Sequence, residues 1–457
     1  MSDVDVVVIG AGIAGLIAAR QAVRAGHRVS VLEARDRVGG RVLNETLPGG
    51  EPIEMGGQWV GPGQHRVLAL LDELGLDTHP TYDDGKHIAE IGGRRSTYTG
   101  RIPALNPLVL ADIQLGQWAA ARAVARCGRP AVAAALDGIT FATWLRRHVR
   151  TDGGRGFFWM IVEATFSAEP EDLSALSAIR YLQAAGGLDA LINTRGGAQQ
   201  DRVVGGTYEI ALRLAAELGD TIVLDAPVTD IAWDAAGVRV ATPAGTVSAR
   251  RAIVAVPPPL AGRIRYSPGL PGDRDQLTSR MPMGRVIKVN VAYPAPFWRA
   301  AGLSGQVTSA DRPFGIVFDN TPPAGDPGVL VGFLEGRHAD AAARLDAEAR
   351  RALVLADLVE YFGPQAGEPI AYLERDWTAE PYSRGGYGAY HTPNTLTRFG
   401  FALSEPIGPL HWAGTETATR WTGYIDGAIE SGMRAAREAD DALRRITDRP
   451  VPAARTD

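Results

Sequence analysis

Apolar runs and glycine-rich turns alternate at the start of the chain. Asp3 to Ile9 reads DVDVVVI, a run of β-branched residues that is typical of a buried parallel strand. Gly10 to Gly15 follow, then a helical pattern to about Ala25, and then a second apolar stretch, HRVSVLEA, from His27 to Ala34. This order predicts a strand, a helix and a second strand, which together form one βαβ unit.

The pattern changes twice beyond this unit. Helical patterns dominate from residue 60 to 204, and β-rich stretches between Gly and Pro turns return from Val203 onward. The clearest predicted helices are Val67 to Leu74, Leu108 to Val124, Thr140 to His148 and Asp346 to Phe362. The predicted strands are TIVLDAPVTDIAW (221–233), GVRVATPAG (237–245) and RRAIVAVPP (250–258), read as antiparallel, and Arg285 to Tyr293. The segment 411–436 predicts a short strand, a Gly-Thr turn and a helix.

These shifts predict an α/β protein with two interleaved domains. A Rossmann-like nucleotide-binding domain would comprise residues 1–79, 205–284 and 385–445. A mixed α+β substrate-binding domain would comprise residues 80–204 and 285–384, and residues 446–457 would form a flexible tail.

Composition narrows the function classes. The 457 residues are 45% hydrophobic and 22% charged, as in soluble globular proteins. The net charge of -5 does not favour binding to nucleic acid or to an anionic membrane. The single cysteine, Cys127, excludes an intrachain disulfide and a multi-cysteine metal site, so no metal is expected. Without a signal peptide or a long apolar span, a cytoplasmic location is expected.

The first turn carries a dinucleotide motif. Gly10, Gly12 and Gly15 give G-x-G-x-x-G between a predicted strand and a predicted helix, and Glu33 lies 18 residues after Gly15. Gly10 permits the tight turn, Gly12 lets the backbone approach a pyrophosphate, and Gly15 lets the helix pack on the strand. The helix N-terminus favours phosphate, and Glu33 would bind a ribose.

A second glycine pair follows that acidic residue. The segment EARDRVGGR (33–41) ends in Gly39-Gly40-Arg41, which allows a second loop to approach the pyrophosphate and lets Arg41 supply charge. This segment, together with IEMGGQWVGPGQHRVLALLDELGL (53–76) and AGTETATRWTGYIDGAIESGMRAA (413–436), strongly resembles the FAD-dependent amine oxidase family, closest to the bacterial and animal monoamine oxidases.

The resemblance implies FAD as the cofactor and the residues that bind it. These are Gly10, Gly12, Ala14, Gly15, Glu33, Ala34, Arg35, Gly40, Arg41, Gly56, Gly57, Gln58, Trp59, Val228, Trp377, Gly414, Glu416 and Ile425. Gly414 and Glu416 would lie near the FAD diphosphate, and the helix from Ile425 would direct its positive end at the flavin. Small residues in that helix, such as Gly427 and Gly432, would let it pack beside cofactor and sheet, although a helix–helix contact explains them equally well.

Three residues carry the expected chemistry. Lys288 lies in the apolar run VIKVNVAY (286–293), where it either faces water or, as in the family it resembles, holds a water against flavin N5 and assists reoxidation. Tyr387 and Tyr424 match the two tyrosines of the family's aromatic cage, which orients the amine. Ile192 and Ile316 are expected in the substrate cavity.

Two departures from the family refine the expectation. Gly386 stands where covalent members tether the flavin through cysteine, which predicts non-covalent FAD. Trp59 stands where the resemblance places the carboxylate-binding arginine of amino-acid oxidases, which favours an amine without a carboxylate.

The predicted function is oxidation of an amine to an imine, then aldehyde and ammonia, with reduction of molecular oxygen to hydrogen peroxide. The alternatives are a polyamine or L-amino-acid oxidase or a desaturase on the same scaffold, or a flavin-bound interaction protein without catalysis. The expected partners are a small amine and oxygen, with neither nucleic acid nor membrane, and the family resemblance leaves a homodimer open.

Overall fold

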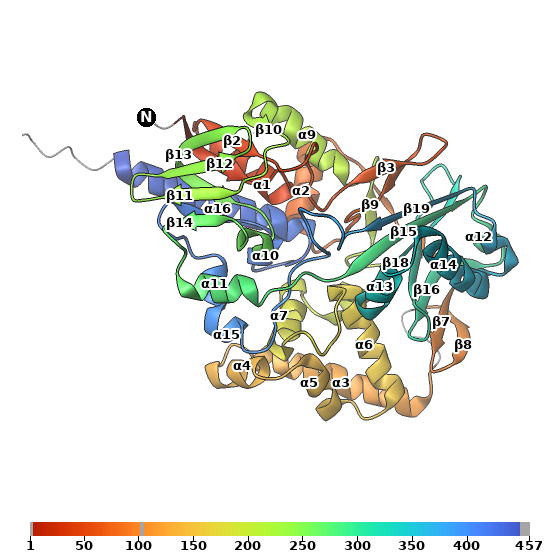
Figure 1. Cartoon of the computed structure of the whole chain (residues 1–457). Helices are drawn as coiled ribbons and strands as arrows, with labels where there is room; N and C mark the ends of the chain where they lie inside the picture. Colours follow the sequence, from red (N-terminus) through yellow and green to blue (C-terminus); the bar gives the residue numbers. More distant parts are fainter. Residues whose placement is uncertain (1–2, 101–104, 448–457) are drawn as a thin grey trace, which may run out of the picture.

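Two large β-sheets and a separate block of helices make up the molecule (Figure 1). The structure, a computed structural model, describes residues 3–100 and 105–447, with only the backbone described at 446 and 447. The flexible tail that the sequence predicts at 446–457 therefore lies almost entirely outside the described residues. The mixture of parallel and antiparallel sheets with many helices confirms the predicted α/β class.

The first sheet has a parallel centre, as the βαβ pattern predicts. Strand β1 pairs in parallel with β2 on one side and β13 on the other. In spatial order the strands are β10 (Ile222–Val223), β2 (Val29–Leu32), β1 (Val4–Ile9), β13 (Gly245–Val254), β12 (Val238–Thr242), β11 (Asp230–Trp233) and β14 (Arg265–Ser267), with β20 (Leu410–Trp412) beside β13.

The prediction of antiparallel strands over 221–258 is partly wrong. Within this range β12 pairs antiparallel with both β11 and β13, whereas β10 lies parallel to β2 and residues 224–229 form no strand. Strand β13 takes part in both kinds of pairing. Its first half pairs antiparallel with β12, and its second half, from Ala249 to Val254, pairs in parallel with β1. That second half is the more buried one, as expected in the centre of a parallel sheet.

The second sheet is mostly antiparallel, and its strand β15, next to the edge strand β19, is fully buried. In spatial order its strands are β19 (Ala371–Asp376), β15 (Val286–Tyr293), β18 (Gly328–Glu335), β17 (Ile316–Asp319), β16 (Leu303–Ser309), β7 (Lys86–Ile91) and β8 (Arg94–Tyr98). Sequence reasoning missed β7 and β8 because KHIAEI and RRSTY are short and polar. Two smaller sheets pair β3 (Asn44–Thr46) with β4 (Pro52–Glu54), and β5 (Trp59–Val60) and β6 (Thr78–Pro80) with β9 (Asp201–Val203).

The helices form three groups, each with its own apolar core. Against the first sheet pack α1 (Ile13–Arg24), α2 (His65–Leu74), α9 (Tyr208–Leu218) and α16 (Ile425–Thr447). The separate block contains α3 (Pro107–Arg126), α4 (Pro130–Asp137), α5 (Phe141–His148), α6 (Asp152–Phe166) and α7 (Ala175–Ala185), followed by α8 (Leu188–Ile192). Against the second sheet pack α12 (Phe297–Ala300), α13 (Gly336–Ala342) and α14 (Ala347–Phe362), and the remaining short helices are α10 (Pro258–Ala261), α11 (Gly272–Ser279) and α15 (Leu396–Phe399).

Local sequence signals explain where several helices begin. Thr140 and Asp346, the predicted first residues of two helices, are the N-caps of α5 and α14, and each side chain accepts a hydrogen bond from a backbone N–H in the first turn. In the described part of the chain, no helix combines the length and the apolar character needed to cross a bilayer.

The strands of the two large sheets come from the predicted ranges of the two domains. Those of the first sheet lie within 1–79, 205–284 and 385–445, and those of the second within 80–204 and 285–384. Strand β9, however, pairs with β5 and β6 across the predicted boundary. The division into domains at these residues therefore stays a prediction.

The small residues of the last helix serve its contact with the first helix. A Cβ at Gly432 would lie 2.4 Å from the carbonyl oxygen of Ala14 in α1, and one at Gly427 would lie 2.3 Å from the carbonyl oxygen of Trp421. The helix–helix explanation thus accounts for Gly432, and glycine there fixes how closely α16 approaches the turn after β1.

We expect Gly432→Ala to destabilise the protein although alanine favours a helix by roughly 1 kcal/mol, because the new Cβ collides with α1 at a cost of about 1–3 kcal/mol. Gly156 in α6 is the matched control, because a Cβ there meets no atom within 4 Å. Gly156→Ala should therefore raise the free energy of unfolding measured in urea. A Gly432→Ala protein as stable as Gly156→Ala would contradict the close contact.

Candidate active site

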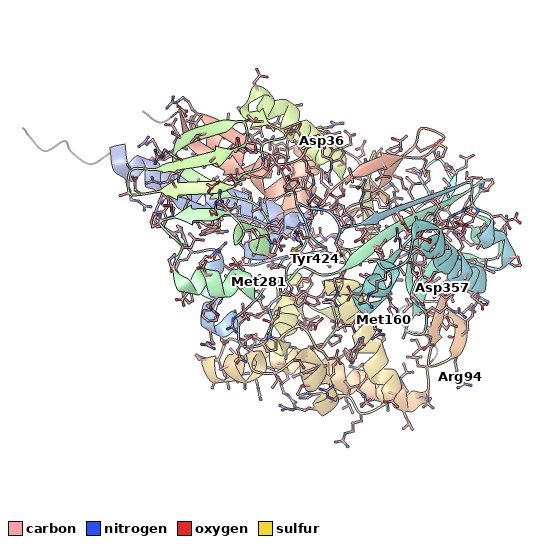
Figure 2. All side chains as sticks on the ribbon, viewed as in Figure 1. Asp36, Arg94, Met160, Met281, Asp357 and Tyr424 are labelled. Atoms are coloured by element: carbon pink, nitrogen blue, oxygen red, sulfur yellow. The ribbon has the colours of Figure 1, made fainter. Side chains whose placement is uncertain are left out.

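One cavity of about 930 Å³ gathers nearly all the residues that the sequence singles out. Residues of both large sheets and of α6 line it, and Figure 2 labels Tyr424 and Met160, two residues of its wall. The predicted residues on its wall are Gly10, Gly12, Ala14, Glu33, Ala34, Arg35, Gly40, Arg41, Gly56, Gly57, Gln58, Trp59, Ile192, Val228, Lys288, Ile316, Trp377, Tyr387, Gly414, Tyr424 and Ile425. Gly15 and Glu416 do not line the cavity.

One end of the cavity is built by the turn between β1 and α1. Gly10 has φ of +101°, which favours glycine, and a Cβ at Gly15 would lie 1.9 Å from the carbonyl oxygen of Gly10. Gly15 therefore lets the helix close on the strand. Glu33, at the end of β2, is buried and accepts hydrogen bonds from the backbone N–H groups of Ala11 (2.7 Å) and Arg35 (3.0 Å).

The second glycine loop packs directly on the first. A Cβ at Gly40 would lie 3.1 Å from Cα of Gly12, so only glycine lets these two loops meet at the cavity wall. The next residue, Arg41, donates to the carboxylate of Glu416 (Nη1 to Oε1, 2.6 Å) and to the carbonyl oxygen of Tyr387 (2.8 Å).

Glu416 stands just behind the cavity wall. Its carboxylate does not line the cavity and instead holds Arg41, which does. Burial alone would raise the pKa of Glu416, yet the charge and hydrogen bonds of Arg41 and the backbone N–H of Ala389 lower it overall. This ion pair connects the second glycine loop to the Gly-Thr turn near the C-terminus.

Lys288 is buried rather than exposed on a surface strand. Its side chain leaves the middle of β15, is 2% exposed, and lines the cavity. The Nζ atom donates to the carbonyl oxygen of Gly56 (2.8 Å) and to Oε1 of Gln58. Burial lowers the pKa of Lys288 to about 7, with Glu54 acting to raise it and Arg202 to lower it. The amine can therefore exchange its proton near neutral pH.

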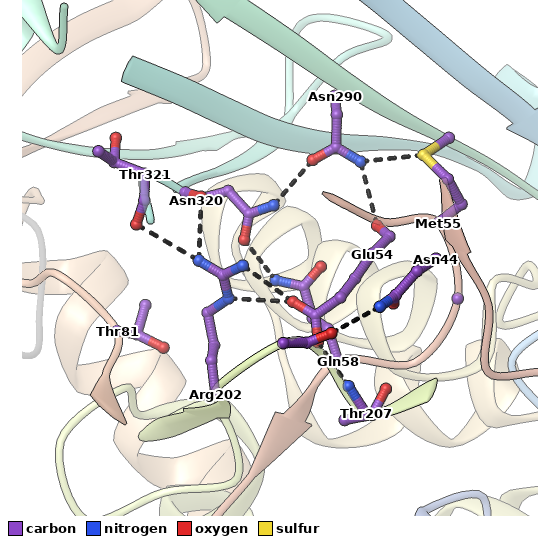
Figure 3. A network of polar contacts seen from close by, with 12 residues as sticks. Asn44, Glu54, Met55, Gln58, Thr81, Arg202, Thr207, Asn290, Asn320 and Thr321 are labelled. Atoms are coloured by element: carbon purple, nitrogen blue, oxygen red, sulfur yellow. Dashed lines mark hydrogen bonds and ion pairs between the residues drawn. The ribbon is translucent and has the colours of Figure 1, made fainter. Parts of the chain in front are cut away.

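Through Gln58, this lysine joins a buried polar network, which Figure 3 shows around Asn290, Asn320, Arg202 and Glu54. Gln58 donates to Asn320 and Asn320 donates to Asn290, each at 2.8 Å. Beside them Arg202 and Glu54 form a buried ion pair at 2.9 Å. Sequence reasoning missed these partners, although a polar residue two positions after Lys288 on the same face of β15 was a readable signal.

The two tyrosines stand on the cavity wall at its centre. Tyr387 follows β19 and its hydroxyl donates to Oε1 of Glu335 (3.0 Å), while Tyr424 immediately precedes α16 with its ring centroid 6.3 Å from that of Tyr181. Burial raises the pKa of Tyr424 to about 12 and that of Tyr387 well above its usual value. Both are therefore neutral phenols at physiological pH. Trp377 lies nearby, with its indole N–H donating to the carbonyl oxygen of Met55 (2.8 Å).

Glu335, which sequence reasoning missed, sits behind Tyr387 at the end of β18. It is 5% exposed, and Ser167 also donates to its Oε1 (3.2 Å). Burial raises the pKa of Glu335 to about 8, and the charge of Glu163 adds to the effect. No sequence pattern indicated a carboxyl group here, because Glu335 ends an otherwise apolar strand.

The remaining wall is largely apolar. Its side chains include Phe157, Met160, Ile161, Leu191, Ile192 and Ile316, so both predicted substrate-cavity residues belong to this surface. The carboxylates Asp83 and Asp84 also line the cavity, but both are paired with Arg195.

The only cysteine of the chain is remote from this wall. Cys127 is buried in the core of the helical block, where its thiol donates to the carbonyl oxygen of Val124 (3.3 Å). Gly386, beside Tyr387, lines the cavity instead.

The buried carboxyl of Glu335 predicts a pH-dependent stability. Its folded-state pKa of about 8 lies above the ordinary 4.5. The contribution of this carboxyl group to the free energy of unfolding is therefore complete below pH 4.5 and is lost as the pH rises to about 8. The Glu335→Gln variant does not have this loss. As the pH rises through that window, its free energy of unfolding should therefore increase relative to that of the native protein by up to about 1.4 kcal/mol per pH unit. Urea unfolding at several pH values measures the difference, and exposed Glu405→Gln is the control. A constant difference would contradict the raised pKa.

Comparison with known proteins agrees with this geometry. The sequence model of the flavin-containing amine oxidoreductases matches residues 13–439. AofH of Mycobacterium tuberculosis, assigned as a flavin-containing monoamine oxidase, is 44% identical over 95% of this chain and 96% of its own length, and putrescine oxidase of Kocuria rosea is 39% identical over 95% and 94%. The solved structure of cyclohexylamine oxidase from Brevibacterium oxydans is 35% identical with a TM-score of 0.92, covering 97% of this chain and 100% of that one. The chain therefore belongs to the flavin-containing amine oxidoreductases.

Proposed function

We propose that the flavin is FAD, held without a covalent bond. The two glycine loops meet at Gly12 and Gly40 and present side-chain-free backbone to the cavity, which fits a diphosphate. The carboxylate of Glu33 stands at the end of β2, as a ribose ligand would. Gly386 beside Tyr387 and the remote position of Cys127 support non-covalent binding, since no cysteine thiol is available on the wall.

The proposed reaction is oxidation of a primary amine by molecular oxygen. The amine becomes an imine, water hydrolyses the imine to aldehyde and ammonia, and oxygen becomes hydrogen peroxide. Bound FAD supplies the two-electron acceptor that neither the amine nor any side chain provides. The observation that carries the proposal is the convergence of Lys288, Tyr387 and Tyr424 on the same cavity as the glycine loops.

The two tyrosines would position the amine. Their neutral, electron-rich rings attract an ammonium ion before it loses its proton and restrict the orientations open to the neutral amine. Two hydrogen bonds hold Tyr387 in place: its backbone carbonyl accepts from Arg41, and its hydroxyl donates to Glu335. Fixed rings cost less entropy at the moment of reaction.

Lys288 would assist the reaction with oxygen. An amine whose pKa lies near 7 can donate or accept a proton in a site from which bulk water is largely excluded. Its two hydrogen bonds to the 56–58 segment hold the Nζ atom at the cavity wall.

The wall favours an apolar amine with a single amino group. Ile192, Ile316 and their neighbours offer apolar contact, and the acids Asp83 and Asp84 share the guanidinium of Arg195, which reduces the negative charge that they present to a second ammonium. Arg41 is likewise held by Glu416 rather than free for the carboxylate of an amino acid. The polyamine and L-amino-acid alternatives therefore rank lower.

We expect anaerobic holoenzyme to lose its visible flavin absorbance with 2-phenylethylamine at least tenfold faster than with putrescine or L-phenylalanine at equal concentration. The reason is that a charged second group must enter the apolar wall at a cost of more than about 1.4 kcal/mol. Stopped-flow absorbance measures the three rates. Faster bleaching with putrescine or with L-phenylalanine would replace the monoamine proposal by the corresponding alternative, and no bleaching with any amine would contradict catalysis.

A further inference from the structure

Three side-chain amides, those of Asn290, Asn320 and Gln58, form a continuous chain of hydrogen bonds (Figure 3), and Gln58 also accepts a hydrogen bond from Lys288. Asn290 Nδ2 donates to the carbonyl oxygen of Glu54 (3.1 Å), and Asn320 Nδ2 donates to Asn290 Oδ1 (2.8 Å). Gln58 Nε2 in turn donates to Asn320 Oδ1 (2.8 Å), and Gln58 Oε1 accepts from Lys288 Nζ. Asn290, Asn320 and Gln58 are all buried, with exposed fractions of 0%, 0% and 2%.

The direction of this amide relay, Asn290–Asn320–Gln58, is fixed at its far end. The backbone carbonyl of Glu54 is an acceptor only, so it requires the NH₂ group of Asn290, and the Sδ atom of Met55 accepts from the same group (3.3 Å). The Oδ1 atom of Asn290 must then face Asn320, and each following amide is oriented in the same sense. Gln58 is thereby left with its oxygen, not its NH₂ group, toward Lys288.

The far end is itself held by charged groups. Arg202 donates to the backbone carbonyl of Asn320 (2.9 Å) and to the carboxylate of Glu54, and Glu54 Oε1 accepts from the backbone N–H of Thr207 (3.1 Å). Among the described residues, the charged groups that face Lys288 are Glu54 and Arg202, which have opposite effects on its pKa. The aromatic groups that face it are the rings of Trp59 and Phe333, about 6 Å away.

The consequence for Lys288 follows from the tetrahedral geometry of an amine. The carbonyl oxygen of Gly56 and the oriented Gln58 take two of the N–H bonds, which is the full complement of a neutral amine. The third position of Nζ then carries a lone pair in the neutral state and an N–H in the charged state. Because Lys288 lines the cavity, that third position is the one available to cavity molecules.

We propose that Gln58, Asn320 and Asn290 are positioning residues for Lys288: their one-way relay holds two acceptors on its amine and reserves the third position for the cavity. The inference rests on the proposed role of Lys288 in the reaction with oxygen. It assigns Gln58 to the lysine rather than to the cofactor, and it gives a role to two fully buried asparagines.

The composition of the chain makes the lysine directly observable. Only two of its 47 basic residues are lysines, Lys86 and Lys288. Arginine stays charged at every accessible pH, whereas lysine can become neutral when it is buried. Lysine labelled with ¹³C at Cε should therefore give two side-chain signals in the holoenzyme, and Lys86→Met assigns them.

The test is a pH titration of the Lys288 ¹³Cε signal in native holoenzyme and three variants. Gln58→Glu should displace the midpoint upward by about one pH unit or more, because a carboxylate replaces the neutral acceptor. Asn320→Leu should lower the midpoint by about half a unit or more, because the freed amide of Gln58 can turn its NH₂ group toward the lysine. Gln64→Met, which removes a buried glutamine of the same segment without touching the relay, should leave it unchanged.

The result that tests the relay itself is the titration midpoint of Lys288 in Asn320→Leu, because Asn320 does not contact Lys288. If Asn320→Leu titrates as native does, the relay is wrong, and this variant decides the question even if Gln58→Glu does not fold. Reoxidation of photoreduced flavin by oxygen gives the second readout, and Asn320→Leu should shift its pH profile in the same direction. Lys288→Met tests the role of the lysine in reoxidation separately from the relay. Unchanged reoxidation in that variant would contradict the role of the lysine, and the titration of the Asn320→Leu protein would still test the relay.

Discussion

Burial of Lys288 in the middle of β15 is the constraint around which this site is arranged. An ammonium group taken out of water is costly unless acceptors surround it, and here the carbonyl of Gly56 and the amide of Gln58 provide them. Both acceptors belong to the segment between β4 and β5, so the lysine joins the second sheet to the chain that follows the second glycine loop. The same contact fixes the cavity wall and leaves an amine that titrates near neutral pH.

A second buried charge completes the assembly. Arg41 lies more than 300 residues before Tyr387 and Glu416 in the sequence, yet it meets the carbonyl of the first and the carboxylate of the second through three short contacts behind the wall. The ion pair thus holds the second glycine loop, one tyrosine and the C-terminal turn in a single arrangement. Close packing of α16 on α1 at Gly432 holds the same turn from the other side. The cavity is therefore framed by interactions that lie outside it.

The sequence predicts the parts of this arrangement that are local and repetitive. The glycine turn, Glu33, the strand of Lys288 and a helix after the Gly-Thr turn near the C-terminus follow from short patterns, and they lie where those patterns indicate. Resemblance to a known family added Tyr387 and Tyr424, which no local pattern distinguishes from ordinary core tyrosines. Glu335, Asn320 and Arg202 could not be found in this way, because each is defined by a partner distant in sequence. The strands β7 and β8 were missed because their short sequences, KHIAEI and RRSTY, carry little hydrophobic alternation.

The central claim is that a buried lysine and two tyrosines make this chain an oxidase of simple amines. An oxygen electrode tests it most directly, with holoenzyme, 2-phenylethylamine and catalase added after the oxygen level has fallen. The account predicts that oxygen is consumed and that catalase returns half of it, because every oxygen molecule has become hydrogen peroxide. Oxidation of the amine that reduces a dye but consumes no oxygen would contradict the account and make the enzyme a dehydrogenase.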